Sequence, residues 1–146
     1  MNEEKKEMHL QKSRDAIIQV DAIQHKIRRP EVKTKLDEVL RAMKNLKDTQ
    51  YLFDSGEKEL DKLYDTYIPY FLLVIGNYQD LEATGHDPRE VREVGDKLIK
   101  ALDTLIDSLE KINYILPQDE ISEASAQAKA EKWKREYDRL TKKTGS

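Results

Sequence analysis

The feature that most constrains the fold is a short apolar segment, residues 67–75, in a chain that is otherwise heavily charged. Its sequence, YIPYFLLVI, contains only apolar, aromatic and proline residues, whereas 38% of the whole chain is charged. A helix that spans a bilayer needs about 20 apolar residues, so this segment is too short to cross a membrane. We therefore expect it to form the bent middle of a buried helix, inside a water-soluble body.

The composition and the spacing of apolar residues predict an all-α protein. The 146 residues fit one domain, 1–146, and the charged fraction is well above the roughly 25% of an average protein. Apolar residues recur at steps of three and four, which is the period of one helical face. Short links between long helices favour antiparallel neighbours. The prediction is an elongated antiparallel bundle of three long core helices, with additional helical segments at both termini.

Proline and glycine positions predict the helix boundaries. The first helix is expected over residues 3–27, and its polar start, residues 1–12, is expected to fray or to project. Pro30 is placed to begin a second helix that runs to about residue 53. A third helix is expected from the DSGE turn to about residue 83, with a kink at Pro69.

The second half of the chain is expected to form two separate helices. The fourth helix begins at Pro88, after an Asp87 cap, and is expected to end at Leu116, before Pro117. PQDE is interpreted as a short link, followed by a fifth helix over residues 121–142. The C-terminal segment, 118–146, is therefore predicted to be a peripheral helix.

Aromatic residues cluster around Pro69, and two interpretations of them stay open. Buried tyrosines need a partner for their hydroxyl groups, so the cluster is either a core with its hydroxyls at the rim or a polar-lined pocket against the fourth helix. The residues of this cluster are Tyr64, Tyr67, Pro69, Tyr70, Phe71 and Tyr78.

A thin apolar stripe on the last helix is the best candidate for an interaction surface. Small residues at its start would allow a neighbouring helix to approach closely, so the stripe either packs at the edge of the body or pairs with another chain. Its residues are Ala126, Ala130, Trp133, Tyr137 and Leu140.

Basic residues gather around Pro30, and they could meet an anionic lipid surface or an acidic partner. The alternative is an ordinary solvated turn, because Glu31 and Asp37 dilute the positive charge. Nucleic acid is not expected, since the net charge is −3 and no aromatic platform accompanies the basic residues. The residues of this basic cluster are Lys26, Arg28, Arg29, Lys33 and Lys35.

The sequence offers no catalytic, cofactor-binding or metal-binding residues. The chain has no cysteine, and it contains no glycine-rich phosphate loop, serine-nucleophile motif or zinc signature. His9, His25 and His86 lie on different segments without ligand spacing, and we expect them at the surface. Lack of cysteine fits a reducing compartment, and the charged N-terminus resembles no signal peptide, so a cytoplasmic location is predicted.

Two segments, AIQHKIRRPEVKTKLDEVL and YDTYIPYFLLVIGNYQDLEATG, resemble the bacterial XpaC-like family, named for 5-bromo-4-chloroindolyl phosphate hydrolysis. The matching elements are Tyr67-Ile68-Pro69, the apolar stretch after it, and the spacing from Tyr78 to Leu81. The resemblance covers roughly residues 16–115. It implies a link to proteins of tellurite or toxic-anion resistance. Members often carry N-terminal membrane helices, which are not seen here, and no catalytic residue can be carried over.

Three hypotheses about function follow. The first is a non-enzymatic helical interaction or scaffold protein, linked by the resemblance to toxic-anion resistance or to the cell envelope, which binds a protein partner or itself through helices. The second is a phosphate-ester hydrolase, as the family name suggests. The third is a small-molecule or lipid-binding bundle that uses residues 64–78. No transmembrane segment is expected, although peripheral membrane contact fits the basic cluster.

Overall fold

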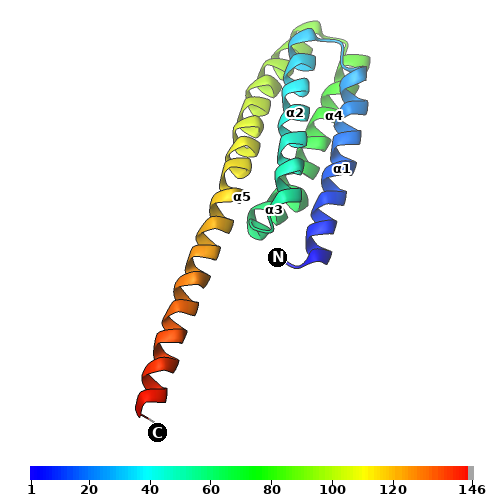
Figure 1. Cartoon of the computed structure of the whole chain (residues 1–146). Coiled ribbons are helices and arrows are strands. Elements are labelled where there is room, and N and C mark those ends of the chain that lie inside the picture. Colours follow the sequence, from blue (N-terminus) through cyan, green and yellow to red (C-terminus); the bar gives the residue numbers. More distant parts are fainter. Residues whose placement is uncertain (145–146) are drawn as a thin grey trace.

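The computed structural model describes residues 1–144, and these residues form helices joined by short turns, with no strand among them. Figure 1 shows the helices side by side in an elongated body, with the C-terminal helix running on beyond it. The elements are α1 (Glu3–Lys26), α2 (Pro30–Leu52), α3 (Glu57–Lys62), the π-helix η1 (Leu63–Tyr67), α4 (Ile68–Thr84) and α5 (Pro88–Thr144). The predicted all-helical class is confirmed.

The body consists of four helical rods, because α3, η1 and α4 follow one another without a break. Helix α2 lies between α1 and α5, while α4 contacts both α1 and α5 on the other side. The sequence predicted three long core helices, but α1 also contributes fully to the core through residues such as Leu10 and Val20. The buried core therefore draws on all four rods.

The N-terminus does not fray, so the prediction for residues 1–12 is wrong. The Asn2 side chain caps α1 by accepting a hydrogen bond from the backbone N–H of Lys5, at 2.8 Å. His9 and Leu10 are buried, and the Lys6 ammonium lies 2.6 Å from the Asp54 carboxylate of the α2–α3 turn. A mostly polar sequence was therefore no sign of disorder, because its polar groups have partners on the neighbouring rod.

Pro69 is accommodated by a π-helical turn immediately before it. The backbone N–H of Ile68 bonds to the carbonyl of Leu63, five residues back, instead of the usual four. A proline in a helix clashes with the carbonyl four residues before it, and a wider π turn is a known response to such local strain. Pro69 itself is exposed, so the irregularity lies on the outer side of the rod.

The apolar segment 67–75 is only half buried, so the prediction that it lies in the middle of a buried helix is wrong for its outer side. Ile68, Phe71 and Ile75 face the core, whereas Tyr70 is 68% exposed and Leu73 is 60% exposed. The fourth rod is therefore covered on one side only, and its aromatic outer face remains open to solvent.

Helix α5 continues through Pro117, so the predicted stop at Leu116 and the predicted PQDE link are wrong. Proline lacks the N–H that would bond to the Asn113 carbonyl, but the turn after α2 holds this segment in place. Ser55 Oγ donates a hydrogen bond to the Leu116 carbonyl, and Thr49 Oγ1 donates one to Asn113 Oδ1. One missing hydrogen bond is therefore not enough to end the helix.

The predicted peripheral helix is instead a projection. From residue 121 to residue 142 every side chain that the structure describes is exposed, and Figure 1 shows this part of α5 extending away from the body. Residues 145–146 of the predicted segment lie outside the described residues. No helix in residues 1–144 has both the length and the apolar content needed to cross a lipid bilayer.

Candidate functional site

The predicted aromatic cluster is divided between the core and the surface. Tyr64, Phe71 and Tyr78 are buried, while Tyr67 is 51% exposed. Tyr70 and Pro69 are also exposed. The cluster is therefore not one site, because a helical segment turns successive residues toward opposite sides.

An apolar groove lies between α4 and α5, beside the exposed tyrosines. It has a volume of about 420 Å³ and is open to solvent. Phe71 and Leu102 form part of its floor, Tyr67 and Tyr70 stand at its edge, and Thr104 and Ser108 supply hydroxyl groups. The pocket that the sequence left open as an alternative therefore has a counterpart, although its lining is more apolar than predicted.

A buried polar cluster, missed in the sequence, links α1, α2 and the third rod. His9 Nε2 lies 2.7 Å from Asp61 Oδ1, and the Tyr64 hydroxyl donates a hydrogen bond to Gln50 Oε1. The rings of His9 and Tyr64 have centroids 6.0 Å apart, and Ser13 lies buried one helical turn after His9. The prediction that His9 is a surface residue is wrong, since it is only 1% exposed.

This polar cluster joins three rods, and its His9, Ser13 and Gln50 side chains are buried, whereas Asp61 is partly exposed. Hydrogen bonding to His9, and next to Lys5, keeps the pKa of the Asp61 carboxyl below its usual value. Although His9, Asp61 and Ser13 are residue types found in hydrolases, Ser13 is completely buried. The cluster is therefore a structural polar contact between helices, next to the π-helical turn that carries Tyr64.

Alkaline pH is expected to destabilise the protein in part through Tyr64. Burial raises the pKa of Tyr64 from 10.0 to about 12, so the folded state keeps its proton at pH values where the unfolded state loses it. Stability is then fully present below pH 10 and falls between pH 10 and 12, by roughly 2–3 kcal/mol for this group. The measurement is urea unfolding at several pH values, in the parent and in Tyr64→Phe. An equally steep alkaline loss in the variant would contradict this assignment.

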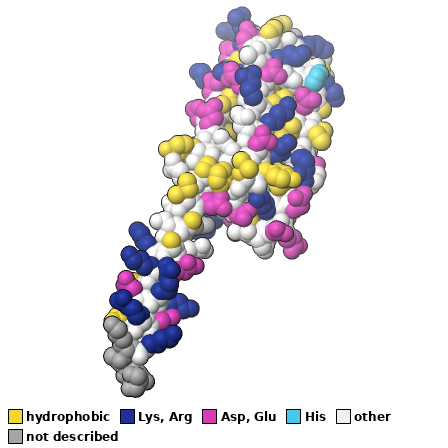
Figure 2. All heavy atoms as spheres, in the orientation of Figure 1, with side chains coloured by type: hydrophobic (Ala, Val, Ile, Leu, Met, Phe, Trp, Pro, Cys, Tyr) yellow, Lys and Arg dark blue, Asp and Glu magenta, His cyan; other side chains and the backbone are white. Residues whose placement is uncertain are grey.

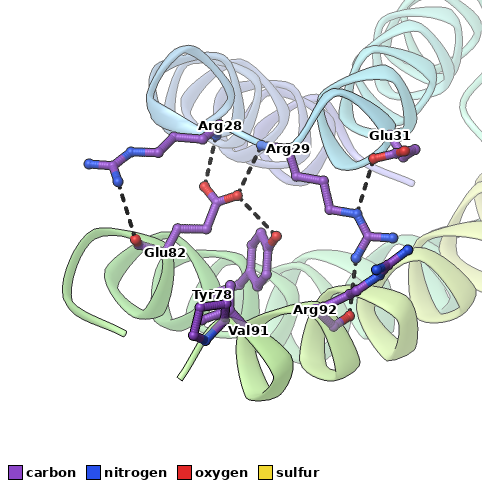
Figure 3. Close-up of a pocket in the computed structure, with 8 residues that line it drawn as sticks. Arg28, Arg29, Glu31, Tyr78, Glu82, Val91 and Arg92 are labelled. Atoms are coloured by element: carbon purple, nitrogen blue, oxygen red, sulfur yellow. Dashed lines mark hydrogen bonds and ion pairs between the residues drawn. The ribbon is translucent and has the colours of Figure 1, made fainter. Parts of the chain in front are cut away.

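The two arginines at the centre of the predicted basic cluster form hydrogen bonds within the protein. Glu82 on α4 accepts hydrogen bonds from the backbone N–H groups of Arg28 and Arg29, at 2.8 and 3.0 Å, and from the Tyr78 hydroxyl at 3.0 Å. Figure 3 shows this carboxylate facing the turn between α1 and α2, with the Arg29 side chain reaching toward α5. The turn is therefore fixed to α4 through Glu82, whose backbone carbonyl also accepts a hydrogen bond from the Arg28 guanidinium.

Arg29 fastens the same turn to α5. Its guanidinium pairs with Asp96 and with Glu31 and donates to the Arg92 carbonyl, and the Asp96 contact is the main cause that raises the pKa of Arg29. A Cβ at the buried Gly95 would lie 2.6 Å from Arg29 Nη1, so glycine leaves room for this approach. Lys35 likewise pairs with Asp103, at 2.6 Å. Lys26 and Lys33 remain part of the predicted cluster, but Arg28 and Arg29 at its centre hold the α1–α2 turn against α4 and α5.

Replacing Glu82 by alanine is expected to lower the free energy of unfolding by about 1–3 kcal/mol. The change leaves the N–H groups of the turn and the buried Tyr78 hydroxyl without their acceptor, and hydrogen bonds to a charged group are at the strong end of the range. Chemical unfolding is the measurement. The matched control is Glu93→Ala on α5, whose partner Arg89 is almost fully solvated and whose loss should change stability by under about 0.5 kcal/mol. Equal effects of the two changes would contradict the role of Glu82.

The described residues provide no evident metal site. No group of three His, Asp or Glu side chains within them is arranged to hold a metal ion. His25 and His86 are exposed, as predicted. The carboxylates Asp61, Asp65 and Asp96 form ion pairs with basic side chains.

The projecting part of α5 carries exposed aromatic side chains on one face. Trp133 is 73% exposed and Tyr137 is 58% exposed, and Leu140 is exposed to the same extent as Tyr137. Figure 2 shows the projection as a narrow rod with many Lys and Arg side chains, some apolar ones and few acidic ones on the visible face. Ala126, Ala130, Trp133, Tyr137 and Leu140, the predicted face, thus lie together on a helix that the body does not cover.

This face continues the seam by which α5 packs into the body. Leu98, Leu102, Leu105, Leu109, Ile112 and Leu116 follow alternating steps of four and three residues and lie buried or half-buried. The same alternation, carried on in register past two acidic positions at 119 and 123, reaches Ala126, Ala130, Trp133, Tyr137 and Leu140. Such a repeat of a and d positions is the pattern of a helix that packs against another helix.

No sequence profile of a known family matches the chain, and no curated protein or solved structure has significant similarity to it. The resemblance to the XpaC-like family therefore stays a prediction.

Proposed function

We propose that the protein is a non-enzymatic helical interaction protein whose contact surface is the face of α5 formed by Ala126, Ala130, Trp133, Tyr137 and Leu140, here called the extension face. The observation that carries this proposal is the heptad register that the extension face shares with the buried seam of the same helix. In the body this register is covered by α2 and α4, whereas beyond residue 120 its described side chains are exposed.

The chemistry of the extension face suits binding to another helix. Trp and Tyr are enriched among the residues that dominate the energy of protein interfaces, and an amphipathic helix commonly binds through such a regularly spaced apolar stripe. Between the aromatic residues and the body, Ala126 and Ala130 offer little side-chain bulk, so a partner helix can approach closely. The body then acts as a rigid base from which the contact helix projects.

Chemical crosslinking of the tagged protein in its native host tests this function. The parent chain should give crosslinked species, with itself or with another protein, that are lost when Trp133, Tyr137 and Leu140 are all replaced by alanine. The control is Glu131→Ala with Lys132→Ala, which alters the outer side of the same helix without changing its net charge. Identical crosslinked species from the parent and the triple variant would contradict the proposal.

Binding of a small apolar or lipid-like ligand is the second candidate function, and the groove between α4 and α5 favours it. Its apolar floor and the tyrosines at its edge are typical of ligand sites. Fatty acids or an apolar fluorescent dye should bind to the parent, and Ala101→Trp, which fills the groove, should weaken that binding at least tenfold. Equal binding by both proteins would exclude the groove as the site.

The remaining roles depend on the resemblance and the composition alone. A place in toxic-anion resistance or in the cell envelope, phosphate-ester hydrolysis and a cytoplasmic location all stay predictions. Among the candidate groups for hydrolysis, His9 and Ser13 are buried, so no specific observation favours that activity over the interaction role.

A further inference from the structure

We propose that the partner of the extension face is a second copy of this chain, bound antiparallel, so that Ala130 faces Trp133 of the other copy and Ala126 faces its Tyr137. This inference rests on the proposed function, since it names the partner for the same surface. It follows from three properties of the helix: the order of small and large residues along the face, the charges beside it, and the length of the projection.

The order of side-chain sizes favours an antiparallel pair. Along the extension face two small residues, Ala126 and Ala130, are followed by two large ones, Trp133 and Tyr137. In an antiparallel pair each small residue lies opposite a large one, which fills the space between the helices evenly. In a parallel pair Trp133 would face Trp133 and Ala126 would face Ala126, so one half would be crowded and the other half would be hollow.

The charges beside the face specify the same orientation. With Ala130 at an a position, Lys129 and Glu136 occupy consecutive g positions and Lys134 occupies an e position. Antiparallel helices bring g positions together, so Lys129 of one copy lies beside Glu136 of the other, twice in the dimer. Parallel helices would instead place Lys129 beside Lys134 of the other copy. Opposite charges at these positions set partner orientation in coiled coils.

The charges also select one register among the antiparallel alternatives. If one helix slides by a heptad in one direction, Lys129 meets Lys129 of the other copy. If it slides in the other direction, Glu136 meets Glu136. Of these three registers, only the one that pairs Ala130 with Trp133 brings the opposite charges together. Residues 119–144 of the two helices then overlap over about 39 Å, at 1.5 Å per residue.

The projection gives this dimer the space that it needs. Because residues 121–142 stand clear of the body (Figure 1), the projecting helices of two copies can lie side by side without a clash between the bodies. The result is a dumbbell in which the two bodies lie at opposite ends of a short two-helix rod. The exposed aromatic residues of both copies are covered in the same step.

Cysteine crosslinking of the purified full-length protein tests the orientation, since the chain has no cysteine of its own. The two variants are Ala126→Cys and Tyr137→Cys, each oxidised alone and as a mixture. In the antiparallel dimer the two sites face one another, whereas equivalent sites of the two copies are about 16 Å apart along the axis, beyond the reach of a disulfide. Only the mixture should therefore form a covalent dimer.

Other crosslinking outcomes would overturn the proposal. Covalent dimers from each variant alone would show a parallel pair. No covalent dimer in any sample, together with a monomeric mass in sedimentation at high concentration, would show that the second copy is not the partner. In that case crosslinked species in the native host that depend on Trp133, Tyr137 and Leu140 would still support the proposed function, with a different partner.

Charge exchange tests the register independently. Lys129→Glu alone and Glu136→Lys alone should each weaken dimerisation by roughly tenfold, because each creates two like-charge contacts in the dimer. The double variant restores opposite charges at both contacts and should return the dissociation constant to within about threefold of the parent. A double variant that dimerises no better than the single ones would contradict the register.

Discussion

Replacement of Gly56 by alanine is expected to lower the free energy of unfolding by about 2–4 kcal/mol. Gly56 has a φ of 79°, which lies in the left-handed region. Residues other than glycine adopt this backbone conformation only at an energetic cost. A Cβ there would also lie 2.0 Å from Cδ2 of Leu116, which is completely buried where α5 leaves the body. Moving a packed leucine adds the cost of overpacking to the backbone strain. Urea unfolding followed by circular dichroism is the measurement.

Gly76→Ala is the matched control for this experiment. Gly76 lies inside α4, and a Cβ added there has nothing within 4 Å. Because alanine is the better helix former, this change should raise stability by about 0.5–1 kcal/mol. If both changes shift stability in the same direction, then the close contact between the α2–α3 turn and Leu116 is wrong.

Replacement of Leu102 by alanine is expected to cost about 2–5 kcal/mol of stability. Leu102 lies on the buried seam of α5 and is 0% exposed, so the change removes buried methyl groups and leaves a cavity beside α5. Thermal or urea unfolding of the purified protein measures the effect. Leu73→Ala, on the open side of α4, should cost under about 1 kcal/mol because that side chain is already in water.

Trp133→Ala distinguishes the two roles of the α5 seam, which are packing within the body and association through the extension face. Trp133 occupies the same heptad stripe as Leu102 but lies beyond the body, so its removal should leave unfolding of the dilute protein within about 0.5 kcal/mol of the parent. The change should instead weaken association strongly. A large loss of stability in the dilute monomer would contradict this division, because it would mean that Trp133 packs against its own chain.

The sequence predicted the regular parts of the fold well, since they depend on local signals. The period of apolar residues located the first four helical segments, and Pro30 and Pro88 marked helix starts correctly. These signals work because a proline at the first position of a helix loses no hydrogen bond. Pro117 was wrongly predicted to follow a helix end. There, contacts from Ser55 and Thr49, which are distant in sequence, hold the helix together.

The parts that the sequence did not reveal depend on contacts between rods. His9 and Ser13 lie buried on the inner face of α1, one turn apart, but polar residues carry no hydrophobic signal that would predict their burial. Their burial depends on Asp61 and Tyr64, about 50 residues further on. A search for polar residues that extend an apolar stripe in register would have found them.

The candidate surface was visible in the sequence, but its setting was not. Ala126, Ala130, Trp133, Tyr137 and Leu140 share a face by spacing alone. The face lies on a continuous α5, in one register with the buried seam, because Pro117 stands inside the helix and does not end it. Conversely, the aromatic cluster around Pro69 is divided, because burial depends on which side of the rod has a neighbour.

Fluorine NMR of the protein labelled with fluorotryptophan tests the central claim most directly, because Trp133 is the single tryptophan of the chain. In dilute purified protein the signal should respond to exchange of water for deuterium oxide, as an exposed indole does. At high concentration, or in extract of the native host, we expect a new signal without that response. A change in the extract alone would support interaction with another protein and exclude the second copy, whereas a Trp133 signal that stays exposed in both samples would contradict the whole account.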